Sequence, residues 1–330
     1  MKPYIFIIFF FIQIKYIPVI LGIFSNNLDE FFRVRVANLQ RAMAVDAASK
    51  TTLGFGVKET IKAVSKRVLE LQDEYNRTFQ TVEQALDEAQ IRILNESEFS
   101  EEHRTFVSNY FKTQIRTHLV PIMIDDRRPF PDLKDGVLYF VVGMEVERAR
   151  GMVTEYALIQ IPPHLPRFII LPADQGERNV AFIDDVIRND LHRIFRLFQP
   201  VKVYAHTIKV TRDAEIDMDD DLSRSLMEKM SDGLDQRKHG EFVRLIYDRE
   251  MPGEMLELVK RKLGLEKSKN VISGSRYHNR KDLMKFPSFG REDLVFPRQE
   301  PLQHPKLRGK SSLIQQVLKG ELLLHFPYHT

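Results

Sequence analysis

Residues 57–93 read VKETIKAVSKRVLELQDEYNRTFQTVEQALDEAQIRI, and this stretch determines the first part of the fold. Apolar residues recur along it in steps of mostly four and three, over about ten helical turns. Because residues three and four apart lie on one helix face, the spacing predicts one long amphipathic helix. Its apolar stripe consists of Val57, Ile61, Val64, Val68, Leu71, Tyr75, Phe79, Val82, Leu86, Ala89 and Ile93.

A second amphipathic helix is expected before the Gly-containing break at residues 51–56. Asn27 and Glu30 have the spacing of a capping box, in which the Asn27 side chain accepts a backbone N–H bond and Glu30 reaches back. The pattern therefore predicts a helix that begins at Asn27. Its apolar stripe is expected to contain Phe32, Val36, Leu39 and Met43.

A third helix is expected from Glu101 to His118, with Ser100 as its cap and Pro121 as its stop. Short breaks separate the three helices, and short connections join antiparallel neighbours. Residues 25–118 therefore predict an antiparallel helical bundle.

The periodicity changes after Pro121. Alternating or short apolar runs predict strands, and apolar residues at helical spacing predict further helices. Strands and helices mix without a regular strand–helix–strand alternation, so the sequence predicts an α+β protein, an amino-terminal antiparallel helical bundle followed by a mixed α/β middle domain. The expected strands are 138–146, 156–161, 167–171, 201–210 and 242–247; the expected helices are 180–198, 222–237 and 254–263; residues 264–312 are expected to form a long ordered loop.

The composition excludes several classes of protein. The chain has 330 residues, of which 43% are hydrophobic and 29% charged, as in ordinary globular proteins. It has no Cys, which excludes disulfide frameworks, thiolate nucleophiles and Cys-ligated metals, and which fits a reducing cytoplasm. The net charge of +3 gives no indication of nucleic-acid binding.

The first 17 residues form an atypical apolar segment. Ile5 to Ile12 are all apolar, but a span of membrane length, from Tyr4 to Phe24, would bury Lys15. No signal-peptide cleavage pattern follows. Two interpretations stay open: a membrane anchor, or a non-native start joined to a soluble domain.

Three patterns that resemble catalytic or metal sites fail on inspection. Residues 304–311 end in Gly-Lys-Ser but lack the first Gly of a phosphate-binding loop. The acidic run 213–221 has Met218 in place of the Gly of an EF-hand and Arg224 in place of its last Glu. The ten His residues contain no H-E-x-x-H motif. None of these three patterns therefore identifies a catalytic residue or a metal ligand.

Local positive charge is strongest over residues 260–285, where nine Lys and Arg residues face only two acidic ones. Such a stretch suits a phosphate-rich polyanion, and a solvated basic loop is the alternative. The candidate phosphate ligands are Arg276, Tyr277 and His278, with Arg33 as a weaker candidate near Asn27.

Four segments together resemble one known family. Residues 21–37 read LGIFSNNLDEFFRVRVA, residues 211–217 read TRDAEID, residues 275–282 read SRYHNRKD, and residues 322–329 read LLLHFPYH. In this order they resemble the bacterial polyphosphate kinases of the phosphohistidine class, over about residues 18–330. The third segment departs from the family's G-R-Y-H-N-F-K-D pattern at Ser275 and Arg280.

The resemblance implies an enzyme that reversibly transfers the terminal phosphate of ATP to inorganic polyphosphate with Mg²⁺. It implies a helical amino-terminal domain over residues 18–120 and a mixed middle domain over residues 121–330. Two phospholipase-D-like domains, with the phosphohistidine and the magnesium ligands, are expected beyond this chain. The family's nucleotide-contacting Asn maps to Asn27, which alternatively serves as the helix cap.

These implications give the expected function. The chain is expected to be a fragment that contributes to the nucleotide cleft and to dimer contacts and that is inactive alone. Its expected partners are ATP or ADP, polyphosphate, a second copy of itself and a separate catalytic half, but not nucleic acid. Its expected location is the cytoplasm, with membrane association if residues 4–24 form an anchor. The alternative function is a non-catalytic module for dimerisation or polyphosphate binding.

Overall fold

The computed structural model describes residues 16–49, 56–125, 129–149, 151–173, 176–213, 242–266, 268, 270–291, 300–309, 312–325 and 328. The chain divides into a main unit, Ile14–Phe289, and a second unit that contains Gly290–Thr330. Three subjects of the sequence analysis lie outside the described residues: the apolar run up to residue 15, the acidic run from residue 214 onward, and the helix expected over 222–237.

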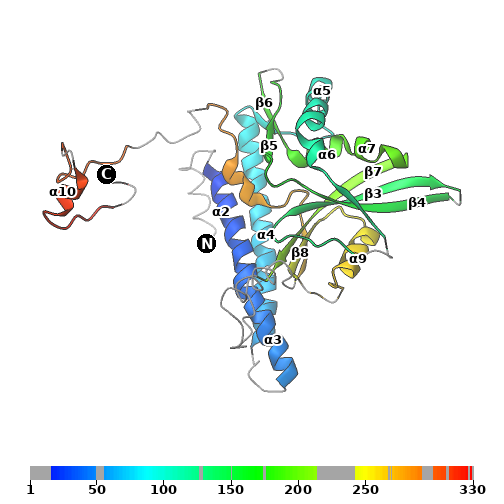
Figure 1. Cartoon of the computed structure of the whole chain (residues 1–330), viewed down its shortest axis with the longest axis horizontal. Coiled ribbons are helices and arrows are strands. Elements are labelled where there is room, and N and C mark those ends of the chain that lie inside the picture. Colours follow the sequence, from blue (N-terminus) through cyan, green and yellow to red (C-terminus); the bar gives the residue numbers. More distant parts are fainter. Residues whose placement is uncertain are drawn as a thin grey trace, which may run out of the picture. The chain divides into compact units, whose positions relative to one another are not determined.

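Two long helical rods lie side by side at the amino-terminal end of the main unit (Figure 1). The first consists of α2 (Tyr16–Phe31), a π-helical turn (Phe32–Val36) and α3 (Ala37–Ser49). The second is α4 (Val57–Glu88), and its buried side chains Val68, Phe79, Val82 and Leu86 all belong to the expected stripe.

The capping box expected at Asn27 is wrong. Helix α2 begins at Tyr16, and Asn27 lies inside it with an exposed side chain. The apolar stripe extends toward the amino terminus through Leu21 and Ile17, which are both buried. Because burial of a whole apolar face outweighs one local cap, the helix continues through the capping pattern.

Helix α2 approaches the 3₁₀ turn Arg280–Lys285 closely, and Gly22 makes the approach possible. A Cβ atom at Gly22 would lie 2.7 Å from Cγ of Met284 and 3.0 Å from its backbone nitrogen. Since the nitrogen belongs to the backbone, a larger residue would push the helix off this turn.

Two sheets form the rest of the main unit. The six-stranded sheet has the order β2-β4-β3-β7-β8-β9, and the three-stranded sheet has the order β1-β6-β5. Pairing is antiparallel except between β8 and β9 and between β1 and β6. The strands are β1 (Ile91–Ile93), β2 (Pro121–Ile124), β3 (Leu138–Arg148), β4 (Gly151–Gln160), β5 (Phe168–Ile170), β6 (Arg178–Phe182), β7 (Lys202–Arg212), β8 (Phe242–Asp248) and β9 (Val271–Gly274).

Helices cover both faces of the six-stranded sheet. On one side lie α5 (Glu101–Tyr110), α6 (Ile183–Asn189) and α7 (Leu191–Ile194), and on the other lies α9 (Gly253–Lys262) (Figure 1). Central strand β3 sends Phe140 and Val142 into the first core and Tyr139 and Val141 into the second. This period-two alternation between two buried faces explains the nearly continuous apolar run of the strand.

The third predicted helix forms, but it packs on the sheet and not with the two rods. Ser100 caps α5 by accepting from the backbone N–H of His103, as expected. Val107, Phe111 and Ile115 of this segment lie in the core of the six-stranded sheet. The α+β class is therefore confirmed, with a helical region of two rods before the mixed sheets.

Four short strands were missed from the sequence. The helix expected over 57–93 ends at Glu88, and residues 91–93 form β1 instead; β2, which begins at Pro121, was not expected. Strand β6 occupies the start of the helix expected over 180–198, and α6 begins only at Ile183. Strand β9 lies within the expected loop over 264–312. All four strands are too short for alternation to stand out, and each forms by pairing with a strand distant in sequence: β1 pairs with β6, β2 with β4, and β9 with β8.

In the second unit, α10 (Leu313–Val317) is a short helix capped by Ser312. The apolar run at 322–325 forms no strand in its described residues. Among the described residues of the whole chain, no helix has the length and hydrophobicity that crossing a membrane requires.

Candidate functional site

Asn27 lies on the exposed side of α2, where its side chain is open to solvent. Asn26, next to it, is also exposed, whereas Leu28 is half-buried and Asp29 is buried. A carboxamide presents one acceptor and two donors, which is the pattern that matches the edge of a nucleobase. One side of α2 thus presents the Asn27 amide to solvent, while the opposite side of the helix is packed.

Asp29 anchors that opposite face to the sheet. Its carboxylate accepts from Nζ of Lys209 on β7 and from Nη2 of Arg244 on β8, the second at 2.5 Å. Lys209 also donates to the side-chain oxygen of Asn279 at 3.0 Å. We call Asp29, Lys209 and Arg244 the Asp29 cluster. It joins three segments that are far apart in the sequence.

The strand register places the two cations of this cluster together. Lys209 and Thr211 are alternate residues of β7, and Arg244 on β8 lies directly across from Thr211. Alternate residues of a strand share one face of the sheet, so these polar groups point to the same side. Further along that face of β7, Ala205 belongs to the apolar core under the helices.

Burial affects all three charges of the Asp29 cluster. Burial alone would raise the pKa of Asp29, but Lys209 and Arg244 hold that pKa below its ordinary value. Burial lowers the pKa of Lys209 and the pKa of Arg244, and the single carboxylate only partly offsets this. Two buried cations therefore share one anion.

Apolar packing surrounds the cluster. Phe32 and Val36 of the π-helical turn pack with Val68 of α4, Val243 of β8 and Ile272 of β9. The guanidinium carbon of Arg244 lies 4.1 Å from the centre of the Phe32 ring, a cation–π distance. These contacts hold both rods against the strands β8 and β9.

Arg33, a candidate phosphate ligand, has two carboxylate partners. Its Nε donates to Asp135 at 3.0 Å and its Nη1 to Glu30 at 2.7 Å. Asp135 in turn accepts from the backbone N–H of Arg212 at 2.9 Å. Arg33, in the π-helical turn, thus forms a second link between the first rod and the segment that enters β3.

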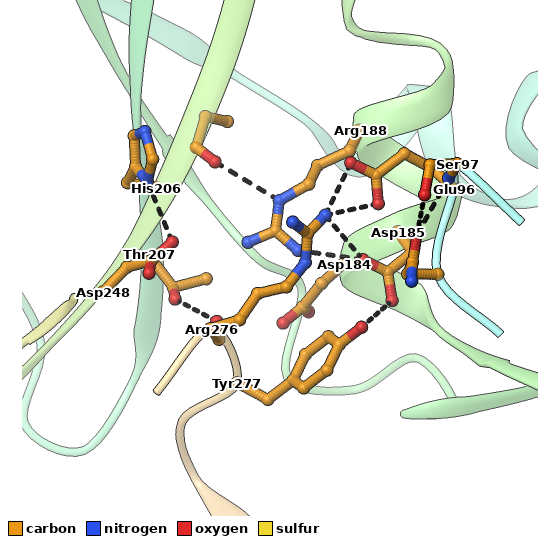
Figure 2. A network of polar contacts seen from close by, with 12 residues as sticks. Glu96, Ser97, Asp184, Asp185, Arg188, His206, Thr207, Asp248, Arg276 and Tyr277 are labelled. Carbon is orange, nitrogen blue, oxygen red and sulfur yellow. Dashed lines mark hydrogen bonds and ion pairs between the residues drawn. The ribbon is translucent and has the colours of Figure 1, made fainter. Parts of the chain in front are cut away.

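Arg276 and Tyr277 belong to a second network, which Figure 2 shows. Nη2 of Arg276 contacts both oxygens of Glu96 and lies 3.4 Å from Asp185, which also accepts from Tyr277 at 2.8 Å and from Arg188 at 2.9 Å. The Tyr277 ring stacks on Phe182. We call Glu96, Asp185, Arg188, Arg276 and Tyr277 the Arg276 network.

Burial dominates the titration of this network. Burial raises the pKa of Asp185 to about 7, against the opposing effect of Arg188 and with the help of Asp184. Burial and the neighbouring Asp185 raise the pKa of Tyr277. Burial alone would lower the pKa of Arg276, but Glu96 and Asp185 hold it above its ordinary value. Arg276 therefore stays charged, and Tyr277 stays a hydrogen-bond donor.

His278 is buried, with 5% of its surface exposed. Its Nε2 lies 3.2 Å from the backbone oxygen of Thr207, and burial lowers its pKa to about 3. A Cβ atom at Gly274 would lie 2.5 Å from the His278 ring, so glycine is needed there. The imidazole is neutral at physiological pH and does not attract an anion by charge.

The structure places the predicted site residues in three separate settings. Asn27 is exposed on α2, Arg33 pairs with acids on the same side of the molecule as the Asp29 cluster, and Arg276, Tyr277 and His278 follow one another after β9. The phosphate-binding roles stay predictions. Arg33 and Arg276 would have to exchange their carboxylate partners to bind a phosphate.

Sequence reasoning missed Asp29, Lys209 and Arg244. A signal was present in β7, where Lys209 and Thr211 alternate with the apolar residues Ile208 and Val210. Polar residues at inward positions of a strand indicate a buried partner. The partner itself, on α2, is separated from β7 by most of the described chain and could not be assigned from spacing.

Among the described residues, no group of three or more His, Asp or Glu side chains could hold a metal ion. The arginines near the buried carboxylates explain this, because a carboxylate that accepts from a guanidinium has fewer lone pairs free for a cation. The described part of this chain therefore does not fit a magnesium site.

Family comparisons agree with this architecture. The polyphosphate kinase N-terminal domain matches residues 18–94, and the polyphosphate kinase middle domain matches residues 102–286. The chain therefore belongs to the polyphosphate kinase family. The two matches separate between residues 94 and 102. The domain boundary expected near residue 120 stays a prediction.

Individual relatives give the same result. A polyphosphate kinase of Yersinia pestis is 36% identical over 318 residues, covering 94% of this chain and 45% of the relative. A polyphosphate kinase of Escherichia coli K12 is 33% identical with the same coverage. The crystal structure of polyphosphate kinase from Porphyromonas gingivalis has a TM-score of 0.74 and 26% identity, over 96% of this chain and 43% of that one. The chain thus spans about half the length of the curated relatives it matches.

Proposed function

We propose that this chain is the amino-terminal and middle region of an ATP–polyphosphate phosphotransferase and that Asn27 contacts the nucleotide. The observation that carries the proposal is the position of Asn27: a free amide on a helix that the Asp29 cluster holds against the sheet. A side chain on a packed helix is held more precisely than one on a loop, which suits it to orient a ligand.

The chemistry of transfer lies outside the described residues in this proposal. ATP or ADP and inorganic polyphosphate are the substrates, and Mg²⁺ is held by residues of the remaining part of the enzyme. When bound, the metal would neutralise charge on the phosphates. This chain contributes binding and orientation, and by itself it does not turn over ATP. A cytoplasmic location and a homo-oligomer belong to the same proposal.

A complementation assay tests the proposal. The full chain is assayed with ATP, Mg²⁺ and polyphosphate, alone and mixed with the separately expressed carboxy-terminal part of the Yersinia pestis relative. We expect transfer only in the mixture. Asn27→Ala should raise the KM for ATP by about fivefold to tenfold, the loss of one or two hydrogen bonds. Asn26→Ala is the matched control and should leave the KM unchanged, because its side chain is also exposed but points about 100° away.

Two results would contradict the proposal. One is an unchanged KM for ATP when Asn27→Ala replaces the original chain in the mixture. The other is phosphate transfer by the chain alone. A second candidate function, a non-catalytic module that dimerises or captures polyphosphate, is favoured by the basic residues over 260–285. Saturable polyphosphate binding with no activity in either assay would support that candidate.

A further inference from the structure

A cavity of about 350 Å³ lies where the two helical rods meet the edge of the six-stranded sheet. Its walls come from α2, α4, β7, β8 and β9 and from the segment that follows β9. This volume lies within the range of small-molecule sites. Asn27 does not line the cavity, so the cavity is separate from the amide face proposed to contact the nucleotide.

The cavity has an excess of positive charge. Lys209 and Arg244 lie at its buried side, with Arg280 and Arg249 as further cations, while Asp29 and Asp73 are the acidic side chains of its wall. His278 also lines it and is neutral because of its low pKa, about 3. Four cations therefore face two carboxylates around this space.

Part of this charge has no counterion in the described structure. Arg244 is 1% exposed, and its only carboxylate hydrogen bond among the described residues is with Asp29, which it shares with Lys209. Its Nε and Nη1 atoms are buried and have no hydrogen-bond partner there. Unpaired buried cations are costly, and an anion in the adjacent cavity would offset that cost.

Arg280 is held in place for such a role. Its guanidinium carbon lies 4.8 Å from the centre of the Tyr75 ring and 4.6 Å from that of Phe79, and its Nη2 donates to Ser275 at 2.7 Å. Stacking on two rings limits the orientations of the planar group, so less entropy is lost when it binds an anion. Arg249 is exposed at the cavity and has no polar partner among the described residues.

We propose that this cavity is a binding site for a small phosphate-type oxyanion, held by Arg249 and Arg280 and attracted by the buried cations Lys209 and Arg244. Forked guanidinium groups match the geometry of tetrahedral oxyanions, and the hydroxyl group of Ser273 in the wall supplies a neutral donor. The site binds its anion whether or not Asn27 contacts a nucleotide, so it is independent of the proposed function.

Titration calorimetry on the full chain tests the site. The probe is inorganic pyrophosphate without metal, at low ionic strength, and a parallel titration uses ADP. We expect saturable binding of one pyrophosphate per chain. Arg249→Gln should weaken binding by about threefold or more and Arg280→Gln by about tenfold. Arg116→Gln, an exposed arginine outside the cavity, is the matched control and should bind as the original does.

The outcomes separate clearly. Binding of pyrophosphate but not ADP identifies an inorganic anion, and ADP binding that Arg249→Gln weakens identifies a terminal phosphate group as sufficient. Absence of saturable binding, or equal weakening in Arg249→Gln and Arg116→Gln, would overturn the proposal. If circular dichroism shows that Arg280→Gln is unfolded, Arg249→Gln decides alone, because Arg249 is exposed and packs no core.

Discussion

The Asp29 cluster and the Arg276 network are both buried groups of charges beside the same sheet, but the pKa values of Asp29 and Asp185 shift in opposite directions. The pKa of Asp29 lies below its ordinary value, whereas burial raises that of Asp185 to about 7. Asp29 faces two cations alone. Asp185 shares Arg188 and Arg276 with Glu96 and has Asp184 next to it in sequence.

The difference shows that the charges nearest to a buried carboxyl group set the direction of its pKa shift. Burial disfavours the charged form of either acid. The two cations beside Asp29 overcome that effect, and Arg276 does so at Glu96, whereas Asp184 and Glu96 add to the effect of burial at Asp185. The excess of cations therefore makes the Asp29 cluster dependent on its one acid, and the Arg276 network is less dependent on any single member.

Removing the acid of the Asp29 cluster should have the largest effect. Asp29→Asn leaves two buried cations without an anion, and we expect a loss of about 3–5 kcal/mol in the free energy of unfolding. Urea denaturation followed by circular dichroism measures it. Glu30→Gln, at the next position on α2 and more exposed, is the control and should cost less than about 1 kcal/mol.

A variant that removes a cation of the cluster instead of its acid sharpens this prediction. Lys209→Met leaves Asp29 paired with Arg244 alone, so it should cost less than Asp29→Asn. Equal costs for the two variants would mean that the cation excess has no influence on stability.

The pH dependence of the Arg276 network should be next in size. Because the folded pKa of Asp185 is about 7 and its unfolded pKa is near 4, the folded state holds a proton between those values. This contribution to stability is present at low pH and is lost as the pH rises to about 7. From pH 5 to pH 7, the free energy of unfolding of the original chain should fall by about 2 kcal/mol relative to that of Asp185→Asn. Urea denaturation of both proteins at the two pH values measures this difference. An equal pH dependence in the two proteins would contradict the role of Asp185 in the Arg276 network.

The smallest expected effect concerns Arg33, which is partly exposed and pairs with Asp135 and Glu30. Solvent screens this pair, so Arg33→Gln should lower the free energy of unfolding by less than about 1 kcal/mol. Thermal or urea denaturation in low salt and in 1 M salt measures the change, since added salt should abolish most of it. A loss as large as that of Asp29→Asn would show that the Arg33 link holds the first rod to the sheet as strongly as the Asp29 cluster does.

The sequence predicted those elements whose pattern is long. The stripe of α4, the apolar runs of β3 and β8 and the alternation of β7 gave both the type and the approximate bounds of each element. The Asn27 cap was wrong because a local pattern competed with a longer apolar face, and β1, β2, β6 and β9 were missed because each is too short to show a period. Asn27 itself could be selected only through the family resemblance, since nothing in its local pattern distinguishes a nucleotide contact from a cap.

Periodicity and composition by themselves determined the α+β class, the long rod α4 and the absence of cysteine chemistry, because these depend only on residues near one another in the chain or on counts. Only the tertiary structure decided which charges meet. Asp29, Lys209 and Arg244 come from a helix and two strands far apart in sequence, and strand register places them within hydrogen-bonding distance. Burial and pairing, which set their pKa values and leave the nearby cavity cationic, exist only after the chain has folded.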